Sequence, residues 1–124
     1  MINNAILKNC HREGFNDGEV YDAYKIFFGT LVSESRLKII NLLRRRSMSV
    51  SEIIAALDAD QTAVSHDLAR LKKCGFVRST IEGKYRNYAL NETTIKPLME
   101  LIEHHMVQHC VHILRASNGG SHDE

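Results

Sequence analysis

The segment from Asp60 to Gly75, DQTAVSHDLARLKKCG, carries side chains whose types and spacing suit the reading of nucleic acid. Its apolar residues Val64, Leu68 and Leu71 recur at helical spacing and predict one buried stripe. Glu and Lys would be more usual on the outer side of a plain surface helix. That side instead holds short or planar hydrogen-bonding groups, which can reach base edges and grip phosphates: Gln61, Thr62, Ser65, His66 and Arg70. The segment therefore predicts a helix that enters a DNA groove.

Two cations follow this helix on a predicted β-hairpin. The runs FVRSTI and YRNYAL are rich in β-branched and aromatic residues, and the turn between them contains Gly83, which is available for positive φ. Lys84 and Arg86 would then lie on a wing, where they can touch the DNA backbone or the minor groove. A plain sheet edge is the alternative, but a hairpin directly after such a helix favours the wing.

Four of the seven histidines lie within nine residues near the C-terminus, in LIEHHMVQHCVHIL. On one continuous helix His105, His109 and His112 fall within about 60° of one another. Imidazoles at this spacing can place two nitrogens on one Zn²⁺ or another divalent transition metal, and a tetrahedral site needs two more donors. The histidines could instead pack and hydrogen-bond at an interface, or form a pH-sensitive contact.

The three cysteines, Cys10, Cys74 and Cys110, are too few and too scattered for a disulfide framework, which favours reduced thiols. Cys74 is expected to be the small residue that closes the groove-entering helix. Pairing of Cys110 with Cys10 across an interface would give a thiol-redox sensor, although no C-x-x-C pattern supports it.

The groove-entering helix needs neighbouring elements to hold it. Ser49-Val50-Ser51-Glu52 matches the capping box S-x-x-E and opens a short helix, SEIIAALD. Asp60 is a natural N-cap for the next helix, and Gly75 ends it. Two helices joined by a turn of a few residues, the second one polar on its outer face, form a helix-turn-helix.

Flanking helices complete the predicted elements. Apolar spacing predicts one helix over residues 19–31 and another in SESRLKIINLLRRR, capped by one of its first two serines. The last helix is expected over residues 92–115, capped by Asn91. Pro97 falls late for a first-turn proline, so this helix should have a kink or a ragged start.

These elements predict a fold that is mainly α with a small β-hairpin, a winged helix-turn-helix in the order ααααββα. We expect one domain over residues 17–115, preceded by a flexible arm of residues 1–16 and followed by a disordered tail of residues 116–124. The length of 124 residues and the hydrophobic fraction of 44% suit one soluble domain.

Charge is unevenly distributed along the chain. Residues 33–90 hold eleven Lys or Arg against six Asp or Glu, a net charge of +5, which leaves −4 for the rest of a chain whose total is +1. A basic middle with acidic ends favours a DNA-binding core flanked by assembly elements, although a chance imbalance of solvated lysines would look similar. No apolar run reaches the roughly 20 residues of a membrane span, and residues 1–14 lack a signal-peptide core, so we expect a cytoplasmic protein without a membrane partner.

Catalysis is not expected. The sequence contains no Gly-rich phosphate loop, no HExxH and no nucleophile motif. A winged-helix module that binds only other proteins is a second alternative. It would show no salt-dependent DNA binding, and the polar face of residues 61–70 together with the basic hairpin argues against it.

The segment QTAVSHDLARLKKCGFV resembles the recognition helix of the ArsR-type (ArsR/SmtB) winged-helix repressors, which reads Q-x-x-V-S-x-H-L-x-x-L-x-x-x-G-L-V or close to it. The Gln, Val, Ser, both leucines and the glycine match. Where the family often has two histidines, His66 matches and Asp67 does not. The upstream pattern over residues 31–43 and the hairpin segment GKYRNYAL also match, and the resemblance covers about residues 20–115.

The resemblance implies a homodimer. In such proteins the first and last helices build the dimer interface, and two recognition helices enter successive major grooves of double-stranded DNA at an imperfect palindromic operator. A dimer also fits the physics, because one winged helix makes too few phosphate contacts for tight binding alone.

Some members of the family sense a metal through D-x-H early in the last helical region and H-x-x-[HE] later, contributed by two subunits. In this register Glu92 and His105 match, whereas Thr94 and Gln108 do not. His109 or His112 could replace the missing ligands, with Cys10 or His11 as further candidates. A C-x-C in the helix before the recognition helix, the other familiar site, is absent, so arsenic or lead sensing by that arrangement is not expected.

The sequence therefore predicts a sequence-specific DNA-binding transcriptional repressor whose DNA affinity is controlled by an effector. The candidate effector is zinc or another divalent transition metal, held by His105, His109, His112 and Glu92. An effector-independent or thiol-redox-responsive regulator is the alternative. An effector can change DNA affinity only if it binds the free and the DNA-bound conformations unequally.

Overall fold

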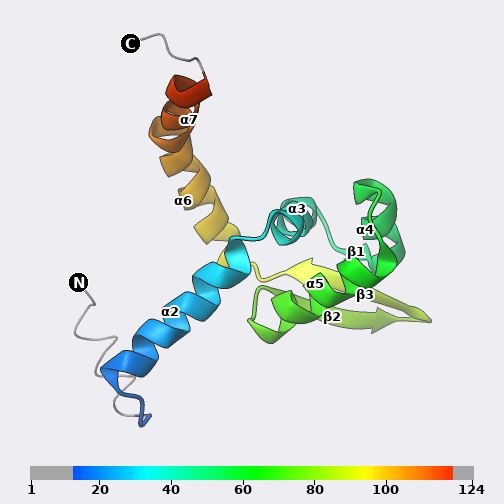
Figure 1. Ribbon diagram of the computed structural model, residues 1–124. Helices are drawn as coiled ribbons and strands as arrows, with labels where there is room; N and C mark the ends of the chain where they lie inside the picture. Colours follow the sequence, from blue (N-terminus) through cyan, green and yellow to red (C-terminus); the bar gives the residue numbers. More distant parts are fainter. Residues whose placement is uncertain (1–12, 119–124) are drawn as a thin grey trace. The chain divides into compact units, whose positions relative to one another are not determined.

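The computed structural model describes residues 13–118, which divide into two compact units at the junction of Ala89 and Leu90 (Figure 1). The first unit runs from residue 13 to residue 89 and holds four helices and most of a small sheet. The second unit, residues 90–118, is helical. The four helices followed by a hairpin and a further helical segment confirm the predicted order, with one added strand and a break in the last helix.

The first helix, α2 (Asp17–Leu31), begins two residues before the predicted start. Its N-cap is Asn16, whose Oδ1 accepts a hydrogen bond from the Glu19 backbone N–H at 2.9 Å, while the Glu19 carboxylate accepts one from the Asn16 N–H at 3.1 Å. This reciprocal capping box satisfies two N–H groups that would otherwise lack partners at the helix start.

The next two helices are capped by the serines that the sequence offers. Helix α3 (Glu34–Leu43) takes Ser33 as its N-cap, and the Ser33 Oγ accepts from the Arg36 N–H at 3.3 Å. Helix α4 (Val50–Leu57) has the predicted capping box between Ser49 and Glu52. Helix α4 ends at Asp58, which adopts a left-handed φ of 49° and turns the chain towards the next helix.

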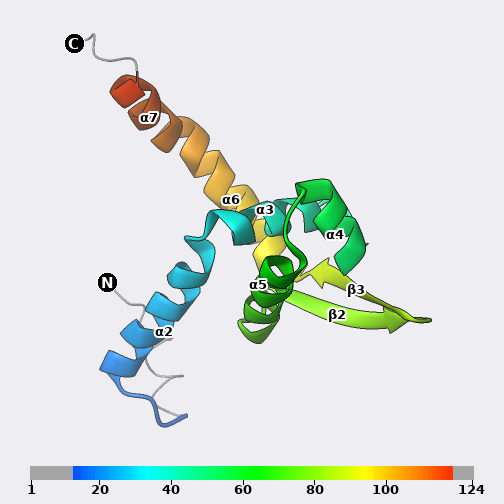
Figure 2. The same ribbon diagram turned by 45° about the vertical axis from the view of Figure 1, so that its right-hand side comes forward.

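Helix α5 (Gln61–Lys73) and the hairpin of β2 (Val77–Glu82) and β3 (Tyr85–Leu90) follow without a long loop. Figures 1 and 2 both show the hairpin projecting beyond α5. A two-residue strand, β1 (Met48–Ser49), pairs antiparallel with β3 and gives the sheet order β1-β3-β2. Strand β1 was not predicted, because two residues are too short to show an alternating pattern.

The core of the first unit is formed by apolar side chains of α3, α4 and α5 and by the base of the sheet. The fully buried members include Ile39 and Ile40 of α3, Ile53 of α4 and Phe76 before β2. Phe27 of α2 stacks on Phe76, with ring centroids 5.2 Å apart, and so ties the end of α2 to this core.

The C-terminal region differs from the single helix expected over residues 92–115. Asn91 caps a turn, because its Oδ1 accepts from the N–H groups of Thr93 and Thr94, and α6 (Ile95–Gln108) begins only after it. His109, with φ −126°, then separates α6 from α7 (Cys110–Asn118), which extends past the predicted tail boundary. No proline or glycine stands at the break, so the usual sequence signal for an interruption is missing.

Most of each expected terminal segment lies outside the described residues. Residues 1–12 of the arm predicted over residues 1–16, and residues 119–124 of the tail predicted over residues 116–124, lie outside the described residues. Between residues 13 and 118, no helix is both long enough and apolar enough to cross a membrane.

Candidate nucleic-acid interface

Helix α5 presents its polar face outward and buries its apolar stripe. Asp60 caps the helix as predicted, with its Oδ2 accepting from the Ala63 N–H at 3.0 Å. Val64, Leu68 and Leu71 are at most 2% exposed, which fixes the face that α5 turns to the core. The five residues of α5 that are predicted to reach DNA are all exposed: Gln61, Thr62, Ser65, His66 and Arg70.

The end of α5 is a Schellman motif built on Gly75. Gly75 has φ +80°, its N–H donates to the Lys72 carbonyl at 3.1 Å, and the Phe76 N–H donates to the Leu71 carbonyl at 2.8 Å. The left-handed residue reverses the chain so that Phe76 enters the core and β2 starts at once. The helix and the hairpin are thereby joined by a short, hydrogen-bonded connection.

The hairpin carries both predicted cations at or near its tip. Gly83 in the turn has φ +63°, a conformation that favours glycine. Lys84 and Arg86 are exposed, and the Lys84 Nζ lies 5.7 Å from the centroid of the Tyr85 ring. Across the strands, the Asn87 amide donates to the Glu82 carboxylate. The exposed cations and the cross-strand bond suit a wing that faces an anionic partner.

Arg70 has a second role that the sequence did not reveal. Its Nε donates to the hydroxyl of Thr30, at 3.1 Å, and Thr30 is fully buried near the end of α2. The residue as a whole remains exposed, so its terminal guanidinium nitrogens can still reach a phosphate. Arg70 therefore joins the interior to the exposed face.

Asp67, the residue that departs from the family pattern, is not part of the exposed face. Its side chain is 15% exposed and its Oδ1 lies 3.6 Å from a terminal nitrogen of Arg36, whose side chain is 18% exposed. The sequence signal for this contact was the substitution of an acid where the family often has histidine. The partner could not be named from the sequence, because Arg36 lies on α3, far along the chain.

One carboxylate in the first unit has a shifted pKa. The backbone N–H of Ser49 and the guanidinium of Arg46 both donate to Glu52, and these bonds lower the pKa of its carboxyl group below the usual value. The Arg46–Glu52 ion pair of 3.2 Å is exposed and screened by solvent. Its importance is local, because it supports the capping box at the start of α4.

The C-terminal histidines are exposed, and only two of them are close together. The rings of His105 and His109 have centroids 4.6 Å apart, whereas the Nε2 of His104 lies 3.4 Å from the Gln108 amide nitrogen. The break at His109 places His112 on α7 rather than on a continuous helical face. Over residues 13–118, no three His, Cys, Asp or Glu side chains gather as a metal site.

The two cysteines within the described residues differ in environment. Cys74 is half-buried at the end of α5, with its sulfur 3.4 Å from the Thr30 hydroxyl oxygen, and Cys110 is exposed at the start of α7. Cys10 lies outside the described residues, so the proposed pairing with Cys110 stays a prediction.

Comparisons with known proteins converge on one family. The sequence model of the bacterial regulatory proteins of the arsR family matches residues 33–79, from the N-cap of α3 to β2. The transcriptional activator HlyU of Vibrio cholerae is 31% identical over 77 residues, which span 62% of this chain and 71% of HlyU. The cadmium resistance transcriptional regulatory protein CadC of Listeria innocua is 40% identical over 76 residues, spanning 60% of this chain and 64% of CadC.

Solved structures show the same architecture. Reduced HlyU from Vibrio cholerae superposes with a TM-score of 0.62 at 27% identity, over 75% of this chain and 95% of that one. The homodimeric winged helix-turn-helix DNA-binding domain of Mb0332 from Mycobacterium bovis gives a TM-score of 0.66 over 90% of this chain and 98% of that one. At 23% identity the second likeness shows the fold.

The relatives are DNA-binding or transcriptional regulators, which agrees with an exposed polar helix followed by a wing. None of these observations supports an enzyme. The chain belongs to the arsR family of bacterial regulatory proteins and is a DNA-binding transcriptional regulator with a winged helix-turn-helix fold.

Proposed function

We propose that the chain is a homodimeric transcriptional repressor whose α5 reads base edges in the major groove of a palindromic operator. The main observation in support is the exposed polar face of α5, which lies opposite the buried stripe of Val64, Leu68 and Leu71. Gln61, Thr62, Ser65 and His66 are the proposed base-reading residues, and Arg70, Lys84 and Arg86 the proposed phosphate or minor-groove contacts. For repression, the dimer bound at its operator needs only to keep the transcription machinery away from that stretch of DNA.

Substitution of the reading residues tests this proposal. A duplex selected by the wild-type protein from a randomised library serves as operator, and a scrambled duplex serves as non-specific DNA. Ser65→Ala or His66→Ala should weaken operator binding by about 1–3 kcal/mol while leaving binding to scrambled DNA nearly unchanged. Equal losses on both duplexes, measured by fluorescence anisotropy at one salt concentration, would contradict a base-reading role.

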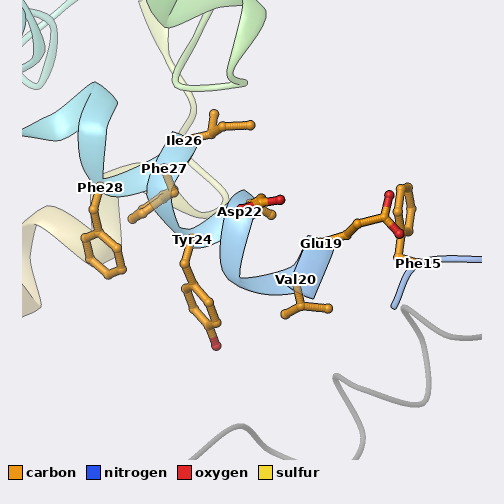
Figure 3. Close-up of a pocket in the computed structure, with 9 residues that line it drawn as sticks. Phe15, Glu19, Val20, Asp22, Tyr24, Ile26, Phe27 and Phe28 are labelled. Atoms are coloured by element: carbon orange, nitrogen blue, oxygen red, sulfur yellow. The ribbon is translucent and has the colours of Figure 1, made fainter. Parts of the chain in front are cut away.

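Exposed apolar faces support the dimer. Tyr24 and Phe28 extend to the same side of α2, and Ile26 extends to the other (Figure 3). All three are exposed, and they line a pocket of about 730 Å³ together with other residues of α2 and with Phe15, which precedes the helix. In the second unit, α6 and α7 also expose large apolar side chains: Leu101, Val107, Ile113 and Leu114. Faces of this kind favour association with a second copy, as in the homodimeric Mb0332 domain.

We further propose that a divalent transition metal such as Zn²⁺ is the effector and is held between two copies. Within the described part of one chain only His105 and His109 are paired. Glu92 precedes α6, and His105 lies about 15 Å along that helix from its first residue, so the two belong to one site only if they come from different copies. The relative named for cadmium resistance supports a metal effector. A bound metal would supply a cross-link between subunits.

Metal titration of the reduced protein tests this second proposal. Stoichiometric Zn²⁺ binding that weakens operator binding, and that is lost in His105→Asn but kept in His104→Asn, would support it. His104 is the matched control, because it is exposed on the same helix without a histidine partner ring among the described contacts. Absence of stoichiometric binding would remove the metal effector and leave the DNA-reading proposal intact. We also propose a cytoplasmic location, because a DNA-binding regulator must act where its operator lies.

A further inference from the structure

Thr30 near the end of α2 is the one polar residue among the fully buried side chains of the described region. Its Oγ1 donates to the Ile26 carbonyl at 2.8 Å and accepts from the Arg70 Nε at 3.1 Å. The Cys74 sulfur lies 3.4 Å from the same oxygen. A single hydroxyl therefore contacts its own helix and two positions of the recognition helix.

The number of hydrogens on the Thr30 hydroxyl determines which partner donates in its contacts with Arg70 and Cys74. A threonine hydroxyl has one hydrogen, and here it is committed to the Ile26 carbonyl. Arg70 and Cys74 must both act as donors towards the oxygen, the latter through its S–H. Residues 70 and 74 are one helical turn apart, so Thr30 contacts the last turn of α5 and its C-cap residue.

Arg36 makes a second connection between the same helices. Its Nε donates to the Thr30 carbonyl at 2.8 Å and its Nη2 donates to the Gly29 carbonyl at 3.1 Å. Carbonyls in the last turn of a helix have no partner within the helix, so this guanidinium caps the end of α2. The other terminal nitrogen of Arg36 pairs with Asp67 of α5.

These contacts constrain the rotation of α5 about its own axis, which the apolar core restrains less. Asp67, Arg70 and Cys74 lie at i, i+3 and i+7 and so share one side of α5. Burial of Val64, Leu68 and Leu71 is non-directional and tolerates a small rotation of the helix about its axis. Hydrogen bonds weaken steeply when their angles change, so the bonds from Arg70 and Cys74 to Thr30 resist that rotation. The Arg36–Asp67 ion pair adds an attraction on the same side of α5.

We propose that Thr30 and Arg36 are positioning residues for DNA reading, which set the rotation of α5 through Arg70 and Asp67 without touching DNA themselves. The proposal rests on α5 being the reading helix. A rotation of α5 displaces Ser65 and His66 relative to the base edges, where hydrogen bonds are sensitive to small shifts. It changes the distance to phosphates much less, because cations on long side chains adjust.

The test compares Thr30→Val, which keeps the side-chain volume and removes the hydroxyl, with Thr30→Ser, which keeps the hydroxyl. Binding is measured on the duplex selected by the wild-type protein and on a scrambled duplex, with urea unfolding recorded for each variant. Thr30→Val should reduce the ratio of operator to scrambled affinity about tenfold and leave the scrambled affinity within about twofold. Thr30→Ser should keep the wild-type ratio within about twofold.

Asp67→Asn and Arg36→Lys carry the test if Thr30→Val does not fold, because they weaken the ion pair at a partly exposed position. Each should lower the same ratio, and the duplex each variant selects from the randomised library should differ from that of the wild type. Folded variants of Thr30, Arg36 and Asp67 that all keep the wild-type ratio would overturn the positioning role. If Ser65→Ala also leaves the ratio unchanged, the failure lies instead in α5 as the reading helix.

Discussion

His66 and Asp67 are adjacent in α5, and the helix gives them different environments. His66 is exposed on the outer face, while Asp67 is turned towards Arg36 and is mostly covered. The exposure of His66 could be predicted, because the apolar stripe at Val64, Leu68 and Leu71 determines which residues point outward. The pairing of Asp67 could not, because it depends on where α3 packs.

Lys84 on the wing should contribute to DNA affinity without contributing to sequence preference. Lys84→Ala is expected to flatten the plot of log affinity against log salt concentration by about one unit, equally on operator and scrambled DNA. Lys25→Ala is the matched control, because Lys25 lies on α2 and pairs with Asp22. An unchanged slope in Lys84→Ala, or an equal change in Lys25→Ala, would count against the wing contact.

Glu52 should make the stability of the first unit depend on pH. Its pKa is lowered in the folded protein, so the charged form stabilises the fold above the unfolded pKa. That contribution is lost as the pH falls through the folded pKa. Urea unfolding of wild type and Glu52→Gln should therefore differ most near neutral pH and converge in acid. Parallel stability curves at all pH values would exclude this role of the carboxylate.

At the scale of elements, local hydrogen bonds determine where α4 and α5 begin and end. The caps at Ser49, Asp60 and Gly75 were predictable, since Ser and Asp are preferred at the start of a helix and Gly just after its end. Strand β1 was not, because its two residues are held by pairing with the distant β3. The break at His109 also lacked a signal, since the surrounding residues all tolerate a helix.

Gly75 should be sensitive to any side chain even though space is available. A Cβ at this position would meet no atom within 4 Å, but the residue has φ +80°, so Gly75→Ala is expected to destabilise the protein by about 1–2 kcal/mol. Gly29→Ala is the control, because Gly29 is helical and equally open, and alanine there should be neutral or stabilising. Urea unfolding that ranks the two variants in the opposite order would contradict the argument.

At the scale of the whole molecule, the fold could be predicted from its elements, whereas the proposed effector site could not. Helical periodicity, turn residues and charge distribution each describe one chain, and the described core follows from them. A site shared between copies depends on how two chains meet, which no spacing within one sequence determines. The four C-terminal histidines show this limit, because two of them pair within the chain and the others do not.

Dimerisation through α2 should be separable from folding. Phe28 is 59% exposed, so Phe28→Asp is expected to leave the secondary structure intact and to shift the protein from dimer to monomer in sedimentation experiments. Operator affinity should fall by at least about tenfold, because half of the phosphate contacts are lost. Ile81→Ser, at an apolar residue on the wing that is 68% exposed, should keep the dimer. A variant at Phe28 that remains dimeric would exclude this face from the interface.

The four proposed base-reading side chains of α5 make few contacts with the rest of the chain. Within residues 13–118, no hydrogen bond, ion pair or ring contact is made by the side chains of Gln61, Thr62, Ser65 or His66, whereas Asp67 and Arg70 are bound to neighbouring helices. Substitutions at the first four positions therefore cost little folding energy. If these four residues read DNA as proposed, we expect a few exchanges there to change the operator that the protein selects, which would make α5 a practical template for engineering altered DNA specificity.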